Sequence, residues 1–188
     1  AIAKEWKSDT VIMVPDQYLA KNVAAQTDIR ILTWPGACEV HELFSADDVN
    51  QLREAHPGVV ILAHPECPPD VLEAADFAGS TSALANYVSE NSPSKVVLLT
   101  ECSMSDNVAA VNPNVNFIRP CNLCPHMKRI TLENIYDCLV TGKYEVKIPE
   151  DVRVRAKQAL DAMMALPKME RPLAFETGLK PLDVEMVM

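Results

Sequence analysis

Residues 10–25 read TVIMVPDQYLAKNVAA, and residues 95–110 repeat the same design as KVVLLTECSMSDNVAA. Each segment has an apolar run, a polar pair that ends in an acid, and a stretch of helical composition that contains Asn-Val-Ala-Ala. In each copy the apolar run predicts a strand and the following stretch predicts a helix, and Asp16 is a suitable N-cap for the first helix. Strands that alternate with helices predict an α/β fold with short parallel sheets.

Both copies continue in the same way, through a second strand to a proline and a cysteine. The first continues through the apolar run 29–33 into WPGACEVH at 34–41, and the second ends in PCNLCPH at 120–126. From the acid to the cysteine is 22 residues in the first copy and 23 in the second. A repeated supersecondary unit implies internal pseudo-symmetry. We therefore expect Cys38 and Cys124 at equivalent positions, and close together where symmetry-related units meet.

The rest of the chain continues the alternation of strands and helices. Proline, glycine and N-cap residues mark the boundaries. The expected strands are 10–14, 29–33, 59–63, 76–78, 96–99 and 115–118, and the expected helices are 18–25, 45–55, 71–75, 83–91, 103–110, 131–140 and 151–165. The strand at 10–14 is apolar, which predicts burial on both faces of its sheet.

The composition is that of an ordinary globular protein with an acidic surface. The 188 residues are 48% hydrophobic, the net charge is −9 and the pI is near 4.9. This charge argues against nucleic acid and anionic membranes as partners, since both need clustered Lys and Arg. Six scattered cysteines do not suggest a secreted disulfide scaffold, so we expect a reducing cytoplasm with thiols available for metal binding or catalysis.

Cys38 and Cys124 are the first candidates for chemistry. Most free cysteines are small buried apolar residues, but the repeat and the neighbouring Pro and His favour metal ligands. Cys121 and Cys124 also form a Cys-x-x-Cys pair, which zinc sites, redox pairs and iron–sulfur clusters all use. A zinc site would normally have a second pair at similar spacing, and this sequence has none.

Two further motifs follow predicted strands. His64 and Glu66, in HPEC, set an imidazole beside a carboxylate for proton transfer, or they form an ordinary turn. His41 is either a supporting group or a substrate contact. Ser80 and Thr81, in a Gly-Ser-Thr-Ser stretch before a helix, bind phosphate or carboxylate, or else simply cap that helix.

Together, and in this order, these motifs resemble the quinolinate synthase family of bacterial NAD biosynthesis. The motifs are PD-x-x-LA-x-NVA, WPGACEVH, HPEC, ADFAGSTS, TE and CNLCPHMK, within about residues 10–140. The resemblance implies three similar α/β domains around a pseudo-threefold axis, each giving one cysteine to a [4Fe–4S] cluster. By position, it assigns Cys38 to the second domain's ligand and Cys124 to the third's. Cys121 is not the ligand that the resemblance implies, and it implies no role for Cys67, Cys102 or Cys138.

The resemblance also implies a domain organisation. Residues 1–38 correspond to the C-terminal half of a second α/β unit, 39–124 to a third unit, 125–166 to helices that return toward a first unit, and 167–188 to a tail. The family's first-domain ligand, in a Cys-Pro-Met-Ala stretch, has no match in this sequence, which opens with Ala1. We therefore expect the C-terminal portion of a longer protein, with the third cysteine ligand upstream.

The implied reaction condenses iminoaspartate with dihydroxyacetone phosphate to quinolinate, phosphate and water, with the cluster as a Lewis acid. Glu66 and His64 would be catalytic, and His41, His64, Glu66, Ser80 and Thr81 would contact substrate. The implied partners are these small molecules and, through a functional contact, the enzyme that supplies iminoaspartate.

Two other hypotheses remain at this point. In a zinc-binding structural module, Cys121 and Cys124 would bind the metal with two of Cys38, His41 and His126. That module would explain the Cys-x-x-Cys pair but not the repeat. The second hypothesis is an inactive fragment with the same fold.

Overall fold

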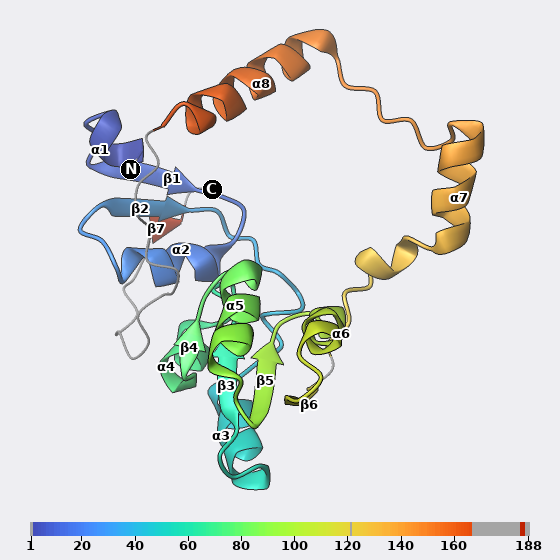
Figure 1. The fold of residues 1–188 in the computed structure, drawn as a ribbon. Helices are drawn as coiled ribbons and strands as arrows, with labels where there is room; N and C mark the ends of the chain where they lie inside the picture. The colour runs from blue at the N-terminus through green and yellow to red at the C-terminus, as the bar shows by residue number, and fades with distance from the viewer. Residues whose placement is uncertain (1, 121, 167–184, 187–188) are drawn as a thin grey trace. The chain divides into compact units, whose positions relative to one another are not determined.

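The computed structural model describes residues 2–120, 122–166 and 185–186 of two compact units (Figure 1). The larger unit comprises Asp9–Cys124 and the strand near the C-terminus, and the smaller one comprises the N-terminal helix and the segment that begins at Pro125. In chain order the elements are α1 (Ile2–Glu5), β1 (Thr10–Met13), α2 (Gln17–Ala24), β2 (Arg30–Thr33), α3 (Ala46–Ala55), β3 (Val60–Ala63), α4 (Pro69–Ala74), β4 (Phe77–Ala78), α5 (Thr81–Asn91), β5 (Lys95–Leu99), α6 (Cys102–Val111), β6 (Asn116–Ile118), the 3₁₀ helix η1 (Met127–Arg129), α7 (Leu132–Thr141), α8 (Glu150–Met164) and β7 (Glu185–Met186).

The first sheet of the larger unit has the order β1-β2-β7, with all strands parallel. Helix α2 packs on one face of it, where Ala20 and Ala24 contact Ile31. Successive side chains of a strand point to opposite faces, so one helix covers only alternate residues. Ile12 consequently remains 62% exposed, and the expectation that this strand is buried on both faces is wrong.

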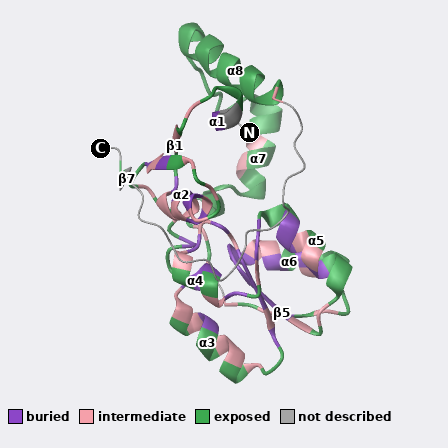
Figure 2. Cartoon of the chain, turned by 90° about the vertical axis from the view of Figure 1, so that its left-hand side faces the viewer, coloured by how far each residue is buried: buried purple, intermediate pink, exposed green. Residues whose placement is uncertain are grey.

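The second sheet, of order β4-β3-β5-β6, is also entirely parallel and is covered on both faces. Ile61 and Leu99 point toward helices α3 and α4, in a cluster with Val49 and Val71. Leu62, Leu98 and their neighbours point the other way, in a cluster with residues of α5 and α6. Figure 2 shows β5 as buried, which is typical of a parallel strand between two helical layers.

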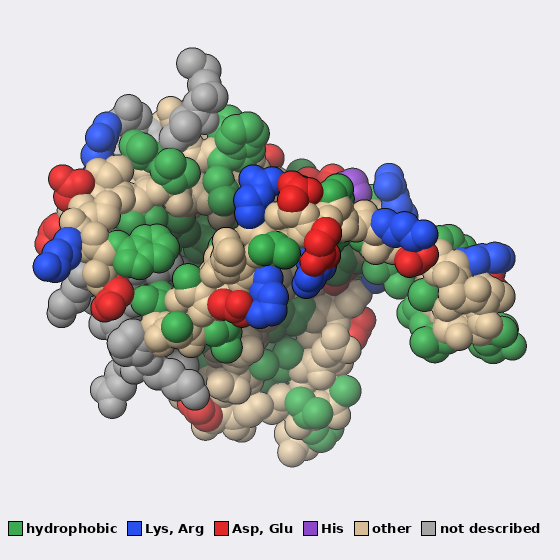
Figure 3. All heavy atoms as spheres, turned by 90° about the horizontal axis from the view of Figure 1, so that it is seen from above, with side chains coloured by type: hydrophobic (Ala, Val, Ile, Leu, Met, Phe, Trp, Pro, Cys, Tyr) green, Lys and Arg blue, Asp and Glu red, His purple; other side chains and the backbone are tan. Residues whose placement is uncertain are grey.

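The smaller unit consists of helices with little burial. Thr131 and Asn134 form a capping box at the start of α7, and Gly142 ends this helix in the left-handed conformation. Neither α7 nor α8 buries a residue, and Figure 2 shows both mostly as exposed. On the face seen in Figure 3, acidic and basic side chains are interspersed, with hydrophobic side chains between them. Within the described residues, no helix combines the length and the apolar character that a membrane span requires.

The predicted α/β class with short parallel sheets is confirmed. The predicted strands and helices all occur, with ends that differ by one or two residues. The sequence did not predict β7, whose two residues pair with Leu32 and Thr33, and such a short strand has no periodic signal. Most of the expected tail, 167–184 and 187–188, lies outside the described residues.

Candidate functional site at the carboxyl edge of the second sheet

The carboxyl ends of the strands in the second sheet lie side by side and lead into the polar motifs. His64 follows β3, Gly79 follows β4 and Thr100 follows β5. The backbone N–H of His64 donates to the Leu99 carbonyl at 3.2 Å, and that of Gly79 donates to the Ala63 carbonyl at 3.1 Å. This edge of a parallel sheet is where α/β proteins bind ligands, so the expected motifs meet at a suitable place.

His41 enters this edge from the loop after β2 and contacts two groups there. Its Nδ1 lies 3.0 Å from Oε2 of Glu66, and its Nε2 lies 2.9 Å from Oγ1 of Thr100. The hydrogen bond with His41 is the main cause of a lowered pKa at Glu66, so this carboxylate is ionised near neutral pH. An ionised carboxylate only accepts hydrogen bonds, so His41 donates from Nδ1.

His64 stacks on His41, with ring centroids 4.3 Å apart and planes inclined by 7°. Its Nδ1 accepts the backbone N–H of Glu66 at 3.3 Å and lies 3.8 Å from the Glu66 carboxylate. Burial, and secondarily the neighbouring His41, lowers the pKa of His64 to about 4. His64 is therefore neutral at neutral pH and carries its proton on Nε2, since Nδ1 accepts. A carboxylate beside imidazole rings is suited to taking up and releasing a proton.

The loop that carries Cys38 is fixed to the start of α2. Asp16 caps this helix through Oδ1, which accepts the Leu19 N–H at 2.7 Å, and its Oδ2 accepts the Cys38 N–H at 2.9 Å. Burial raises the pKa of Asp16, although its backbone hydrogen bonds act in the opposite direction. A Cβ on Gly36 would lie 2.6 Å from the Pro15 carbonyl oxygen, so the turn before Cys38 requires glycine.

The second copy of the repeat makes the same connection. Glu101 caps α6 through Oε2, which accepts the Ser103 N–H at 2.8 Å, and its Oε1 lies 3.5 Å from the Cys124 N–H nitrogen. The Asn122 side chain donates to the Val40 carbonyl at 3.4 Å. The loops that carry the two cysteines are therefore neighbours. Sequence analysis predicted Asp16 as an N-cap but did not predict that each acid also accepts from a cysteine amide.

Asn22 and Thr100 are contacts that sequence analysis missed. The buried Asn22 side chain donates to the carbonyls of Pro65 at 2.8 Å and Cys67 at 3.0 Å, which ties α2 to the turn that contains Glu66. Both residues lie within the repeated segments, and that repetition was the one available signal. Their individual contacts cross between distant segments and have no local pattern.

A group of side chains with the chemistry of metal ligands lies at the same place. Sγ of Cys38, a ring nitrogen of His41 and a carboxylate oxygen of Glu66 are within 4.8 Å of one another. Cys38 and Cys124 are half-buried, whereas Cys67 is buried and its pKa is raised by that burial. Iron–sulfur clusters are held by thiolates, so two accessible thiols on neighbouring loops fit the donors of such a cluster, and Cys67 does not. Cys121 lies outside the described residues.

Ser80 and Thr81 lie at the same sheet edge, because β4 pairs with β3. Both are exposed, and Oγ of Ser80 accepts the Ala83 N–H at 3.3 Å as the N-cap of α5. This contact is the ordinary capping role, and binding of an anion by these residues stays a prediction.

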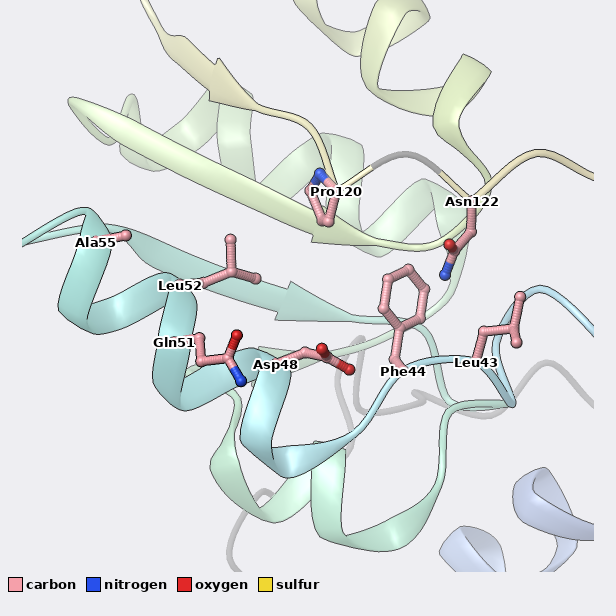
Figure 4. A pocket seen from close by; sticks show the side chains of 8 residues that line it. All are labelled: Leu43, Phe44, Asp48, Gln51, Leu52, Ala55, Pro120 and Asn122. Atoms are coloured by element: carbon pink, nitrogen blue, oxygen red, sulfur yellow. The ribbon is translucent and has the colours of Figure 1, made fainter.

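A separate cavity of about 350 Å³ lies beside α3 and the loop after β6 (Figure 4). Its lining includes Phe44, Leu52 and Asn122. None of the predicted site residues lines it. The carboxylate in its lining, Asp48, already forms the capping box of α3 with Ser45.

Comparisons with known proteins agree with the resemblance found in the sequence. The family model described as quinolinate synthetase A protein matches residues 1–165. A quinolinate synthase of Caulobacter vibrioides is 52% identical over 187 residues, which are 98% of this chain and 51% of that protein. Quinolinate synthases of Agrobacterium fabrum and Xylella fastidiosa are 58% and 59% identical over 156 residues, which are 83% of this chain and 45% and 46% of those proteins. The chain thus spans about half the length of these curated relatives.

Proposed function

The chain belongs to the quinolinate synthase family, and we propose that it serves the condensation of iminoaspartate with dihydroxyacetone phosphate to quinolinate in NAD biosynthesis. The observation that supports this proposal most directly is the grouping of Glu66, His41 and His64 at the carboxyl edge of the second sheet. The reaction releases phosphate and two waters, so it needs several proton transfers at one place. A half-exposed carboxylate next to two imidazoles supplies a group for them.

In this proposal Glu66 moves the proton. Its carboxylate is ionised at neutral pH and takes a proton from a substrate carbon or nitrogen, then returns it to a departing hydroxyl. His41 holds the carboxylate through Nδ1, and His64 directs its Nε2–H to a substrate carboxylate or carbonyl oxygen. Ser80 and Thr81 bind phosphate or carboxylate with their hydroxyls and with the N–H groups at the start of α5.

The cofactor in this proposal is a [4Fe–4S] cluster with Cys38 and Cys124 among its ligands. Such a cluster, when bound, supplies an iron that acts as a Lewis acid toward a hydroxyl or carboxylate oxygen. The Asp16 and Glu101 carboxylates fix the backbone of the two cysteines. Glu66 lies within 4.8 Å of Cys38, so a substrate held near the thiols would be within reach of the base.

The rest of the proposal concerns location and partners. We place the protein in the cytoplasm, where the thiols of Cys38 and Cys124 would stay reduced. Its partners would be the two small substrates, and contact with the enzyme that supplies iminoaspartate stays a prediction. Because the net charge of the chain is negative, anionic substrates must be attracted by local groups, and we propose that helix N-termini and histidines serve this purpose.

A closed zinc site is the alternative from a different class of protein. Both ring nitrogens of His41 already have protein partners, Glu66 and Thr100, so zinc binding there would break one of these contacts. Cys38, His41 and Glu66 nevertheless form a group of donors that could bind a single metal ion. Metal analysis distinguishes such a zinc site from an iron–sulfur cluster.

The test is the iron, inorganic sulfide and zinc content per chain after anaerobic purification and reconstitution. About four iron and four sulfide support the cluster. About one zinc without sulfide contradicts it and supports the structural module.

A second measurement tests the base. Glu66→Gln in a chain of the relatives' full length should abolish turnover and leave the cluster's absorbance unchanged. Glu73→Gln, an exposed change in α4, is the matched control and should retain turnover. Turnover of Glu66→Gln at the wild-type rate would show that another group is the base.

A further inference from the structure

We infer that Thr100 is a positioning residue for Glu66 and acts on it through His41. The inference builds on the proposed function, in which Glu66 transfers protons. Thr100, His41 and Glu66 form one hydrogen-bonded chain, with Oγ1 to Nε2 at 2.9 Å and Nδ1 to Oε2 at 3.0 Å. Neither the sequence nor the family comparisons assign a role to Thr100.

The two end groups of this hydrogen-bonded chain, Glu66 and Thr100, indicate where the ring proton of His41 lies. Glu66 is ionised and accepts, so His41 donates from Nδ1, and in the tautomer with this single ring proton Nε2 has a lone pair. The Thr100 hydroxyl is the donor to that lone pair. The tautomer of His41 is therefore fixed from both sides, and a buried ring nitrogen without this donor would be costly.

The exposure of the three side chains indicates which end of the hydrogen-bonded chain acts on substrate. Thr100 is 4% exposed and His41 is 7% exposed, whereas the Glu66 side chain is 26% exposed. A hydroxyl, an imidazole and a carboxylate also form the triad of serine hydrolases, but there the hydroxyl faces the substrate. Here the order is reversed, so the hydroxyl anchors the chain and the carboxylate is the working group.

Thr100 is attached to a buried central strand of the second sheet. Thr100 directly follows β5, whose Val96–Leu99 residues are buried and paired with β3. The next residue, Glu101, caps α6 and accepts from two N–H groups. The hydrogen bond with Thr100 thus holds the His41 ring, which belongs to a loop, against the end of a strand. The ring in turn holds the Glu66 carboxylate in one orientation.

The experiment compares Thr100→Val, which keeps the shape and removes the hydroxyl, with Thr100→Ser, which restores it. ¹⁵N NMR of the His41 ring in this chain reports which nitrogen is protonated, independently of quinolinate synthesis. We expect Nδ1–H alone in the wild type, a mixture of the two tautomers in Thr100→Val, and the wild-type pattern in Thr100→Ser. Thr33→Val, a buried change at the end of β2, is the matched control and should leave His41 unchanged.

Two NMR outcomes would overturn the inference. One is a wild-type His41 that carries its proton on Nε2 alone, which needs no variant to be measured. The other is a wild-type ring pattern in Thr100→Val. In an active chain of the relatives' full length, Thr100→Val should also lower kcat roughly tenfold to a hundredfold with little change in KM, as the loss of an orienting partner does elsewhere. If Thr100→Val changes the His41 ring pattern but leaves kcat at the wild-type value, Thr100 does not position Glu66 for turnover, and the inference is overturned while the role of Glu66 is left to the Glu66→Gln test.

Discussion

Replacing His64 should remove a large part of the acid sensitivity of the larger unit. The folded chain holds the pKa of His64 at about 4, against an ordinary value of 6.5, because the ring is buried beside His41. Between these two values the unfolded chain binds a proton that the folded chain does not. The contribution of neutral His64 to the free energy of unfolding is therefore fully present above pH 6.5 and is lost as the pH falls toward 4. At 1.36 kcal/mol per pH unit, the loss is about 3 kcal/mol.

The assay is urea unfolding of the wild type and of His64→Gln at several pH values between 7 and 4. Glutamine can accept the Glu66 N–H in place of Nδ1 but does not titrate. The wild type should lose about 3 kcal/mol more than the variant over this range, mostly above pH 4.5, the ordinary value for Glu66. His56→Gln, at the C-cap of α3, should keep the wild-type slope. Equal slopes for the wild type and His64→Gln would refute the reasoning.

Two further predictions concern the cysteine loops. Asp16→Ala removes a helix cap and leaves the Cys38 N–H without its acceptor, so we expect it to lower the free energy of unfolding by about 2–4 kcal/mol. The exposed control Asp47→Ala should change the free energy of unfolding by less than about 0.5 kcal/mol. Denaturant titration measures both, and equal effects would contradict the double role of Asp16. Iodoacetamide should modify Cys38 much faster than Cys67, because burial raises the pKa of the Cys67 thiol. Mass spectrometry of each peptide checks this, and comparable rates would show that Cys67 is accessible.

The fold was readable from the sequence because its signals are local. The apolar run 96–99 and the stretch 103–110 predict a strand and a helix without knowledge of any partner. The exposure of Ile12 could not be read in this way, since it depends on the number of faces that helices cover. The pairing of Leu32 with Glu185 joins segments far apart in the chain and has no local pattern either.

The candidate site was readable only in part. Glu66, His41 and His64 were singled out because they follow predicted strands, and the structure brings them together. From the sequence, His41 could be interpreted either as a supporting group or as a substrate contact. Its contacts with Glu66 and Thr100 favour support, and they depend on residues 25 and 59 positions away along the chain. Spacing within a motif cannot reveal such contacts, because the sheet edge creates them.

The repeat explains why the two cysteine loops have the same support although their acids differ. In a strand–helix–strand unit, the N-terminus of the helix and the loop after the second strand lie at the same edge of the sheet. A carboxylate at the helix start can therefore accept from the helix and from the cysteine loop together. The shorter Asp16 makes the closer contact to its cysteine amide, 2.9 Å, and the longer Glu101 makes one of 3.5 Å. The shared geometry thus comes from the topology of the unit, which tolerates either acid as long as the acid and the cysteine occupy the two ends of the same helix–strand segment. That requirement accounts for the nearly equal separations of 22 and 23 residues in the two copies.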